Sequence, residues 1–210
     1  LGWAYWLTDR QEDAVELWTR LVDIAPEEPM GYNLMGQVAT RNGDFGKAYD
    51  YDSKRLELNP SQFEIRVSLA QVLLWGGDRE AAIENFTQLF EEDPERTDIQ
   101  IDLAWSLYGN EQYEESLYHW NQIIDAIPGH AGFLIARANV HLLMGMLSEA
   151  EQDAYAALEV EPENLAALNI LIALSIQNNR PRETVARLRV LQDRVEGREN
   201  QIRVAQRIAV

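Results

Sequence analysis

The chain contains no cysteine among its 210 residues, so disulfide bonds, zinc–thiolate sites and thiol chemistry are excluded. Histidine is scarce: His119, His130 and His141 are the three in the sequence, and they fall at unrelated positions of the repeat described below. The sequence also lacks a glycine-rich phosphate loop, a G-x-S-x-G nucleophile motif and an H-E-x-x-H metal motif. We therefore predict that the chain is not an enzyme and has no cofactor or metal site.

Basic residues are few, with 18 lysines and arginines against 35 aspartates and glutamates, and the net charge is −17. Such a chain repels nucleic acids and anionic membranes, because both are bound by basic surfaces. From Arg180 onward the balance is reversed, with eight arginines and four acidic residues. This pattern fits either an ordinary solvated surface with a basic end or a polar array that orients a partner.

Long apolar runs are missing as well. No segment of about 18 uncharged apolar residues is present, so no direct membrane insertion is predicted. No basic segment followed by an apolar stretch marks a signal peptide. The first residue is Leu1 rather than methionine and lies inside a repeat, so we expect a fragment, in which the missing signal does not decide the compartment.

The most regular feature of the sequence is the spacing of its prolines. Five of the seven prolines are 34 residues apart: Pro26, Pro60, Pro94, Pro128 and Pro162. Such a constant interval indicates an internal repeat, and a repeat array behaves as one elongated domain. A single array is predicted over residues 1–210, with units at 1–28 (partial), 29–62, 63–96, 97–130, 131–164 and 165–198 and a closing helix at 199–210.

Small residues recur at two positions of each unit, where two helices must approach closely. They are Gly2, Gly36, Ala70, Ala104 and Ala138 at position 8, and Ala14, Ala48, Ala82, Ser116, Ala150 and Thr184 at position 20. Glycines at Gly43, Gly77 and Gly145 mark the turn between the two helices, and the proline ends the second one. Position 29 is acidic in every unit, which we interpret as an exposed face of the second helix: Asp23, Glu57, Glu91, Asp125, Glu159 and Asp193.

These positions resemble those of tetratricopeptide repeat (TPR) proteins. The family's L-G-x-x-Y, A, F and P positions are matched first by Leu1, Gly2, Tyr5, Ala14, Trp18 and Pro26. They are matched again one period later by Met35, Gly36, Gly43, Phe45, Ala48 and Pro60. The resemblance implies an all-α, right-handed superhelical solenoid of antiparallel helix pairs, with about five and a half repeats.

Three charged residues depart from the TPR pattern. Asp52 and Arg55 stand where an aromatic residue and an alanine are expected, and Arg137 takes a leucine position. A charge buried alone costs several kcal/mol, so each must be paired or lie at a partly wet joint. We expect Asp102 to be the partner of Arg137. His141 replaces the usual tyrosine and is expected in the core or at its boundary.

In TPR proteins the ligand-facing concave wall is built from the first helix of each unit. The resemblance therefore implies the following partner-binding residues: Trp3, Trp6, Asn33, Gln37, Arg41, Gln71, Trp75, Asp98, Trp105, Tyr108, Asn139 and Asn169. Four of the six tryptophans fall on this wall, whereas Trp18 and Trp120 fall on core positions. The wall aromatics either anchor a partner or pack against neighbouring helices. Chaperone tails are excluded as ligands, because Lys47 and Lys54 lie on second helices and the wall has one arginine.

A second resemblance concerns residues 69–78, in which a tryptophan directly precedes the glycine turn. This segment is similar to repeats in the periplasmic arrays of Pel-type exopolysaccharide export porins. It implies a scaffold that recruits a polysaccharide-modifying enzyme to an outer-membrane complex for biofilm formation, with an acidic body suited to a cationic polysaccharide. Two other functions stay open: a protein-binding adaptor, in the cytoplasm for example, and a groove that binds glycans through Trp75, Trp105 and Tyr108.

Overall fold

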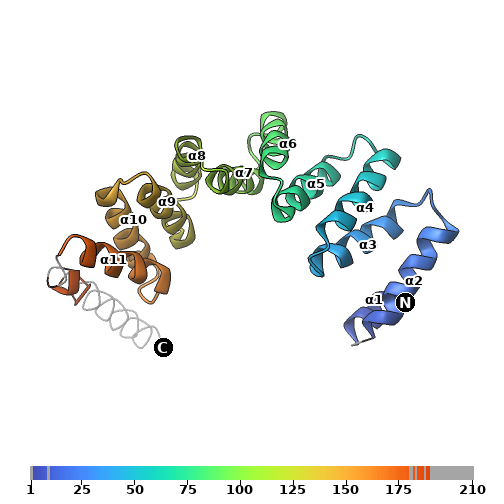
Figure 1. Ribbon diagram of the computed structural model, residues 1–210, viewed down its shortest axis with the longest axis horizontal. Helices are drawn as coiled ribbons and strands as arrows, with labels where there is room; N and C mark the ends of the chain where they lie inside the picture. Colours follow the sequence, from blue (N-terminus) through green and yellow to red (C-terminus); the bar gives the residue numbers. More distant parts are fainter. Residues whose placement is uncertain (1, 9, 180–181, 183, 187, 190–210) are drawn as a thin grey trace, which may run out of the picture. The chain divides into compact units, whose positions relative to one another are not determined.

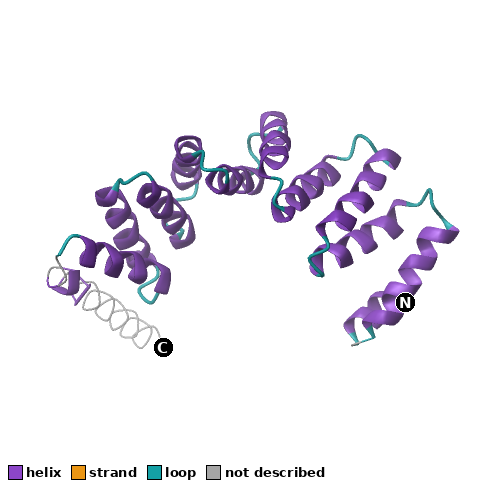
Figure 2. Cartoon of the chain, in the orientation of Figure 1, coloured by secondary structure: helices purple, strands orange, loops and turns teal. Residues whose placement is uncertain are grey.

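The computed structural model describes residues 2–8, 10–179, 182, 184–186 and 188–189. These residues are almost entirely helical, with short connecting loops and no strand among them (Figure 1 and Figure 2). The helices are α1 (Gly2–Leu7), α2 (Gln11–Ile24), α3 (Pro29–Arg41), α4 (Phe45–Leu58), α5 (Phe63–Gly76), α6 (Arg79–Glu92), α7 (Thr97–Gly109), α8 (Tyr113–Ala126), α9 (Ala131–Leu143), α10 (Leu147–Val160) and α11 (Leu165–Gln177). The all-α prediction is confirmed.

The helices follow the period read from the prolines. The first residues of the predicted units begin the odd-numbered helices from α3 to α11, at Pro29, Phe63, Thr97, Ala131 and Leu165. We call these odd-numbered helices, with α1, the first helices and the even-numbered ones the second helices. Each repeat proline lies two residues beyond the end of a second helix. The predicted closing helix at 199–210 lies outside the described residues.

The chain divides into two compact units, unit 1 (Leu1–Asn110) and unit 2 (Glu111–Val210). The boundary falls between α7 and α8, inside the predicted unit 97–130. Each unit is described by itself below, and the single array over 1–210 stays a prediction.

Close packing of helix pairs explains the small residues. Ala14, Ala48, Ala82, Ser116 and Ala150 are completely buried, as are Ala70, Ala104 and Ala138. In unit 1, Ala70 and Ala82 belong to a core that includes Phe86, Leu89, Ile99 and Leu103. In unit 2, Ala138 and Ala150 belong to a core that includes Leu134, Leu158, Leu171 and Leu174. Each such large side chain contributes about 1.5–3 kcal/mol by leaving water.

Where the structure describes it, the turn between the two helices of a repeat includes one residue in the left-handed conformation. In three repeats this residue is a glycine that the sequence placed in the turn: Gly43, Gly77 and Gly145. The equivalent residue at the boundary between the units is Glu111, with φ of 63°. A residue with a Cβ atom pays about 1–2 kcal/mol to adopt this conformation. The turn at Glu111 is therefore less favourable than the glycine turns.

The charged residues that break the repeat pattern are paired. In unit 1, Asp52 is only 3% exposed and accepts hydrogen bonds from Arg55 Nη1 and Ser68 Oγ, both at 2.5 Å. Arg55 lies one turn further along α4, whereas Ser68 belongs to α5. The bond from Ser68 therefore links one repeat to the next.

The predicted pairing of Arg137 with Asp102 is wrong. Arg137 donates to Asp153 at 3.0 and 2.6 Å and to Asn121 Oδ1 at 2.9 Å, while Asp102 accepts from Gln71 at 2.8 Å. Arg137 thus reaches from α9 to Asp153 on α10, the second helix of its own repeat. His141 is buried, as expected, and its Nδ1 lies 3.1 Å from the same carboxylate.

Candidate partner-binding surface

The predicted wall residues of unit 1 lie along the first helices α1, α3, α5 and α7. Gln37, Arg41, Trp75, Asp98 and Trp105 are exposed there. Trp6, Asn33, Gln71 and Tyr108 are half-buried, and Trp3 lies in α1 with a side chain outside the described set. In unit 2, Asn139 on α9 is half-buried and Asn169 on α11 is exposed. We call the unit 1 residues the first-helix surface.

The aromatic residues of the first-helix surface are partly embedded and partly available. Trp75 is 51% exposed, with its ring 6.5 Å from that of Phe45. Trp105 is 38% exposed and meets Tyr108 edge to face, with ring centroids 5.6 Å apart. Each ring therefore packs on a neighbouring aromatic residue and keeps a substantial exposed fraction, and the anchoring of a partner by these rings stays a prediction.

At the start of unit 1 the aromatic residues line a hollow, which we call the Trp6 groove. Its volume is about 600 Å³, and it is lined by Trp6, Leu7, Gln11, Trp18, Leu34, Gln37, Val38 and Arg41. Trp6 stacks at a tilt on the buried Trp18, with 5.4 Å between ring centroids. The guanidinium of Arg41 lies 5.4 Å from the centre of the Trp6 ring, at cation–π distance. The groove thus combines an apolar floor with one cation.

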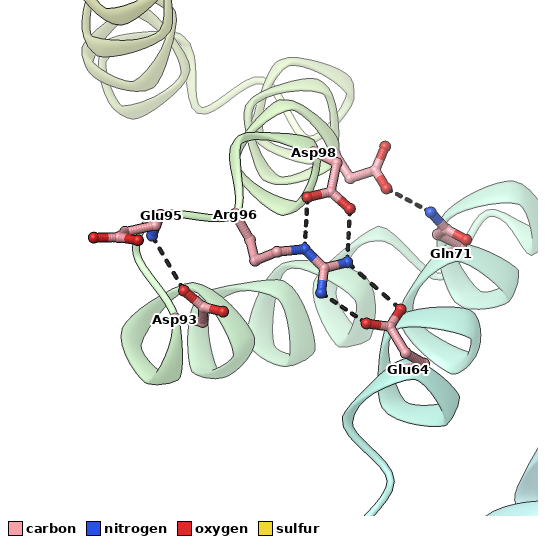
Figure 3. Close-up of polar contacts among 7 residues, drawn as sticks. Glu64, Gln71, Asp93, Glu95, Arg96 and Asp98 are labelled. Carbon is pink, nitrogen blue, oxygen red and sulfur yellow. Dashed lines mark hydrogen bonds and ion pairs between the residues drawn. The ribbon is translucent and has the colours of Figure 1, made fainter.

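The one acidic residue of the first-helix surface, Asp98, is ion-paired within unit 1. Figure 3 shows the Arg96 guanidinium between Asp98, to which it donates at 2.9 and 2.8 Å, and Glu64, at 2.7 Å. These bonds lower the pKa of the Asp98 carboxyl. They hold Asp98 in an internal network, so its carboxylate is less available to a partner than the sequence suggested.

Gln71 is also engaged within unit 1, because its side-chain amide donates to the carboxylate of Asp102. Figure 3 shows this bond as the dashed line that leaves Gln71. Burial raises the pKa of Asp102, and the hydrogen bond from Gln71 opposes that rise. Two of the predicted partner-binding residues, Gln71 and Asp98, therefore take part in hydrogen-bond networks that connect α5 with the region of α7.

One further hollow in unit 1 was not predicted. Its volume is about 600 Å³, and it lies where α4 begins and α5 ends, lined by Gly43, Asp44, Phe45, Gly46, Tyr49, Asp50, Val72, Leu73, Gly76 and Asp78. Two of its carboxylates cap helices, since Asp44 accepts from the Lys47 amide and Asp78 from that of Ala81. The signal in the sequence was Gly76, where an added Cβ atom would lie 3.3 Å from the Cβ of Phe45 and narrow the hollow.

The histidines and carboxylates do not assemble into a metal site. No group of three or more potential ligands converges anywhere in the part of the chain that the structure describes. The Nδ1 atom of His141 lies at hydrogen-bond distance, 3.1 Å, from a carboxylate oxygen of Asp153. Of the helices described, none is both long and apolar enough to cross a bilayer.

Comparison with known proteins gives the family. The protein-family model for the coatomer epsilon subunit matches residues 11–204. The chain belongs to the coatomer epsilon subunit family. The sequence itself has no significant match among curated proteins.

Solved structures of TPR proteins share the fold of this chain. It is similar to YrrB, described as a TPR protein with an unusual peptide-binding site, at 16% identity and a TM-score of 0.67, over 80% of this chain and 87% of the other. MamA from Desulfovibrio magneticus is 17% identical, with a TM-score of 0.70 over 78% and 93% of the two chains. A tetratricopeptide repeat protein from Parabacteroides merdae is 15% identical, with a TM-score of 0.74 over 88% and 73%.

Proposed function

We propose that this member of the coatomer epsilon subunit family is a non-catalytic scaffold that binds a protein partner through the first-helix surface of unit 1. The observation that carries the proposal is the gathering of exposed aromatic rings on successive first helices, at Trp75 and Trp105, beside the Trp6 groove. Tryptophan and tyrosine dominate the energetics of protein interfaces, because they bury large areas at small entropic cost.

The second helices offer a different surface. The acidic residues at position 29 are exposed in every repeat that the structure describes at this position: Asp23, Glu57, Glu91, Asp125 and Glu159. Exposed, evenly spaced carboxylates keep a protein soluble but bind weakly by themselves. This contrast favours the first helices as the contact side. The family description names a subunit, and YrrB is described as binding peptide, which also supports protein recognition over catalysis.

The proposal is tested by changing Trp105→Ala together with Tyr108→Ala and measuring capture of the partner from the native extract. We expect at least a tenfold loss of affinity, the size typical of a central aromatic contact. Tyr118→Ala, which removes a 59% exposed tyrosine from the second helix α8, is the matched control and should leave capture unchanged. Equal capture by both variants, with unchanged helical content, would place the interface elsewhere.

Glycan binding is the second candidate function, and the edge-to-face pair of Trp105 with Tyr108 favours it, since sugars stack on such rings. Titration of oligosaccharides against tryptophan fluorescence distinguishes the two. Absence of any change at millimolar sugar, with partner capture intact, would eliminate the glycan function.

The finer role, recruitment of a polysaccharide-modifying enzyme to an exopolysaccharide export complex in the bacterial periplasm, stays a proposal that rests on residues 69–78 alone. A partly deacetylated, cationic polysaccharide is its natural companion, because the chain carries a net charge of −17. Identification of the captured partner by mass spectrometry tests it directly. An enzyme that acts on polysaccharide supports this role, and a cytoplasmic adaptor partner overturns it.

A further inference from the structure

We propose that the Trp6 groove binds a segment of the partner in which a bulky apolar side chain is followed closely by a single carboxylate. The proposal deepens the function given above and rests on it, because it assigns the chemistry of one part of the first-helix surface. It is based on the contacts of Arg41, which lies over the Trp6 ring, and on the residues that line the groove around it.

Arg41 differs from the other arginines of the described first helices. Arg66 on α5 is ion-paired with Glu92 at 2.7 Å, and Arg137 on α9 with Asp153 at 2.6 Å. Arg41, by contrast, has no ion pair among the described residues and instead lies over the Trp6 ring. In a chain of net charge −17, an arginine that forms no ion pair with any described residue has its charge available for a carboxylate from outside.

The apolar residues that line the Trp6 groove form the site for the bulky apolar side chain of the partner segment. Trp18, Leu34 and Val38 form buried walls, and Leu7 is exposed at the rim. A leucine or phenylalanine side chain that enters such a hollow gains about 1.5–3 kcal/mol by leaving water. The stacking of Arg41 on Trp6 holds the guanidinium at the edge of this apolar site, so the carboxylate must follow the anchor closely along the peptide.

Two glutamines at the groove can hold the peptide backbone between the anchor and the acid. Gln11 and Gln37 both line the hollow. Gln37 donates from Nε2 to Asn33 Oδ1 at 3.1 Å, which fixes its amide and leaves its carbonyl oxygen as an acceptor for a backbone N–H. The groove therefore has a donor for the carboxylate, an acceptor for the main chain and an apolar floor.

Selection for one carboxylate, rather than for an acidic run, comes from the neighbouring hollow. It shares Trp6 and Val38 with the Trp6 groove and is lined on its other side by Glu12 and Glu16 of α2. A second acidic residue of the peptide on that side would face these carboxylates without a counter-charge. The residue on the α2 side is therefore expected to be neutral or basic.

The test uses a random dodecapeptide display library selected on the full chain, followed by affinity measurement of the enriched peptides. We expect enrichment of an apolar residue followed within three positions by one Asp or Glu. Arg41→Gln should weaken these peptides by 10- to 30-fold, and raised salt should weaken wild-type binding in the same direction. Arg20→Gln, at an exposed arginine of the second helix α2, is the matched control and should bind like wild type.

Three results overturn the inference: no enriched peptide, enriched peptides with acidic runs, or equal affinity for wild type and the Arg41→Gln variant. Because Arg41 is exposed, an unchanged melting temperature is expected for this variant, so lost binding cannot come from lost folding. If partner capture depends on Trp105 and Tyr108 but not on Arg41, the scaffold function stands and the Trp6 groove assignment fails. If the peptides depend on Arg41 while capture depends on neither aromatic, the groove stands and the wider surface fails.

Discussion

Each unit has a buried aspartate among its described residues, Asp52 in unit 1 and Asp153 in unit 2, and the two are neutralised differently. In unit 1, Asp52 receives one bond from Arg55 on its own helix and one from Ser68 on the next. In unit 2, Asp153 receives two bonds from Arg137 on α9 and contacts His141, also on α9. Arg137 reaches further to Asn121 on α8, so its network spans three helices.

The comparison shows that a buried aspartate can be neutralised mainly from its own helix or by groups on neighbouring helices. The Asp52 pair is largely local, since Arg55 is one turn away and its Nε has no hydrogen-bond partner among the described residues. The Asp153 network joins three consecutive helices, α8, α9 and α10, whereas the bonds of Asp52 join only α4 and α5. Removal of Asp153 leaves the part-buried Arg137 guanidinium charged and without its ion-pair partner, which is where the cost lies.

The largest effect is expected for Asp153→Ala. It leaves Arg137 and His141 without their shared carboxylate, at a site where Asp153 is only 4% exposed. We expect a loss of about 3–5 kcal/mol in the free energy of unfolding, measured by urea titration of the helical circular dichroism signal. A loss below about 1 kcal/mol would show that water reaches the network, and would remove the distinction between the units.

A smaller loss is expected for Asp52→Ala in the same titration. Arg55 can move toward solvent, and Ser68 loses one hydrogen bond, so about 1–3 kcal/mol is the expected cost. Ser68→Ala serves as a control that removes only the bond between repeats. If Asp52→Ala costs as much as Asp153→Ala, the local character of the unit 1 pair is refuted.

A gain of roughly 1 kcal/mol is expected for Glu111→Gly. This residue is held at φ of 63°, a conformation that costs a residue with a Cβ atom about 1–2 kcal/mol and glycine much less. The greater freedom of glycine in the unfolded chain offsets part of this gain. Thermal unfolding measures the outcome, with Gly145→Ala as the reciprocal change expected to destabilise. A destabilised Glu111→Gly variant would mean that the Glu111 side chain makes a stabilising contact.

The smallest expected effect is a change of stability with pH. All three histidines belong to unit 2 and none to unit 1, so a histidine effect is confined to unit 2. Burial lowers the pKa of His119 below its ordinary value of 6.5. The unfolded chain therefore takes up a proton at a higher pH than the folded chain, and stability falls as the pH drops through about 6.5. Urea midpoints at pH 7.5 and 5.5 should reveal this decrease, and His119→Gln should reduce it. An unchanged slope in the variant would assign the pH dependence to other groups.

In unit 1 the corresponding effect has the opposite sign. Burial raises the pKa of Asp102 above its ordinary value of 3.8, so the folded state takes up its proton first. The contribution of Asp102 to stability therefore rises as the pH falls toward 3.8. Asp102→Asn should abolish this contribution, as judged from hydrogen exchange of α7 corrected for the intrinsic pH dependence. If the corrected exchange rates of α7 change with pH by the same amount in the Asp102→Asn variant and in the wild type, the proposed contribution of Asp102 is contradicted.

The sequence predicts the fold closely because the 34-residue period records its geometry. The prolines, the small residues at the helix contacts and Gly43, Gly77 and Gly145 locate the helices to within about a residue. The left-handed turn at Glu111 could not be read in this way, since a glutamate carries no signal for positive φ. Its position became evident only from the period of the other turns.

The candidate site was less predictable, because its side chains choose partners in three dimensions. The period placed Gln71 and Asp98 on the first helices, but not their bonds to Asp102 and Arg96. The predicted pair of Arg137 with Asp102 was wrong for the same reason, because the repeat pattern does not show that Arg137 reaches Asp153 on the second helix of its own repeat. The Trp6 groove depends on the tilt of two indole rings, which no spacing specifies.

The central claim, that a protein partner contacts the first helices of unit 1, is tested most directly by hydrogen exchange of the full chain with and without its captured partner. The account predicts slowed exchange in peptides from α3, α5 and α7, with little change in α4 and α6. Protection confined to α4 and α6, where Glu57 and Glu91 are exposed, would contradict it.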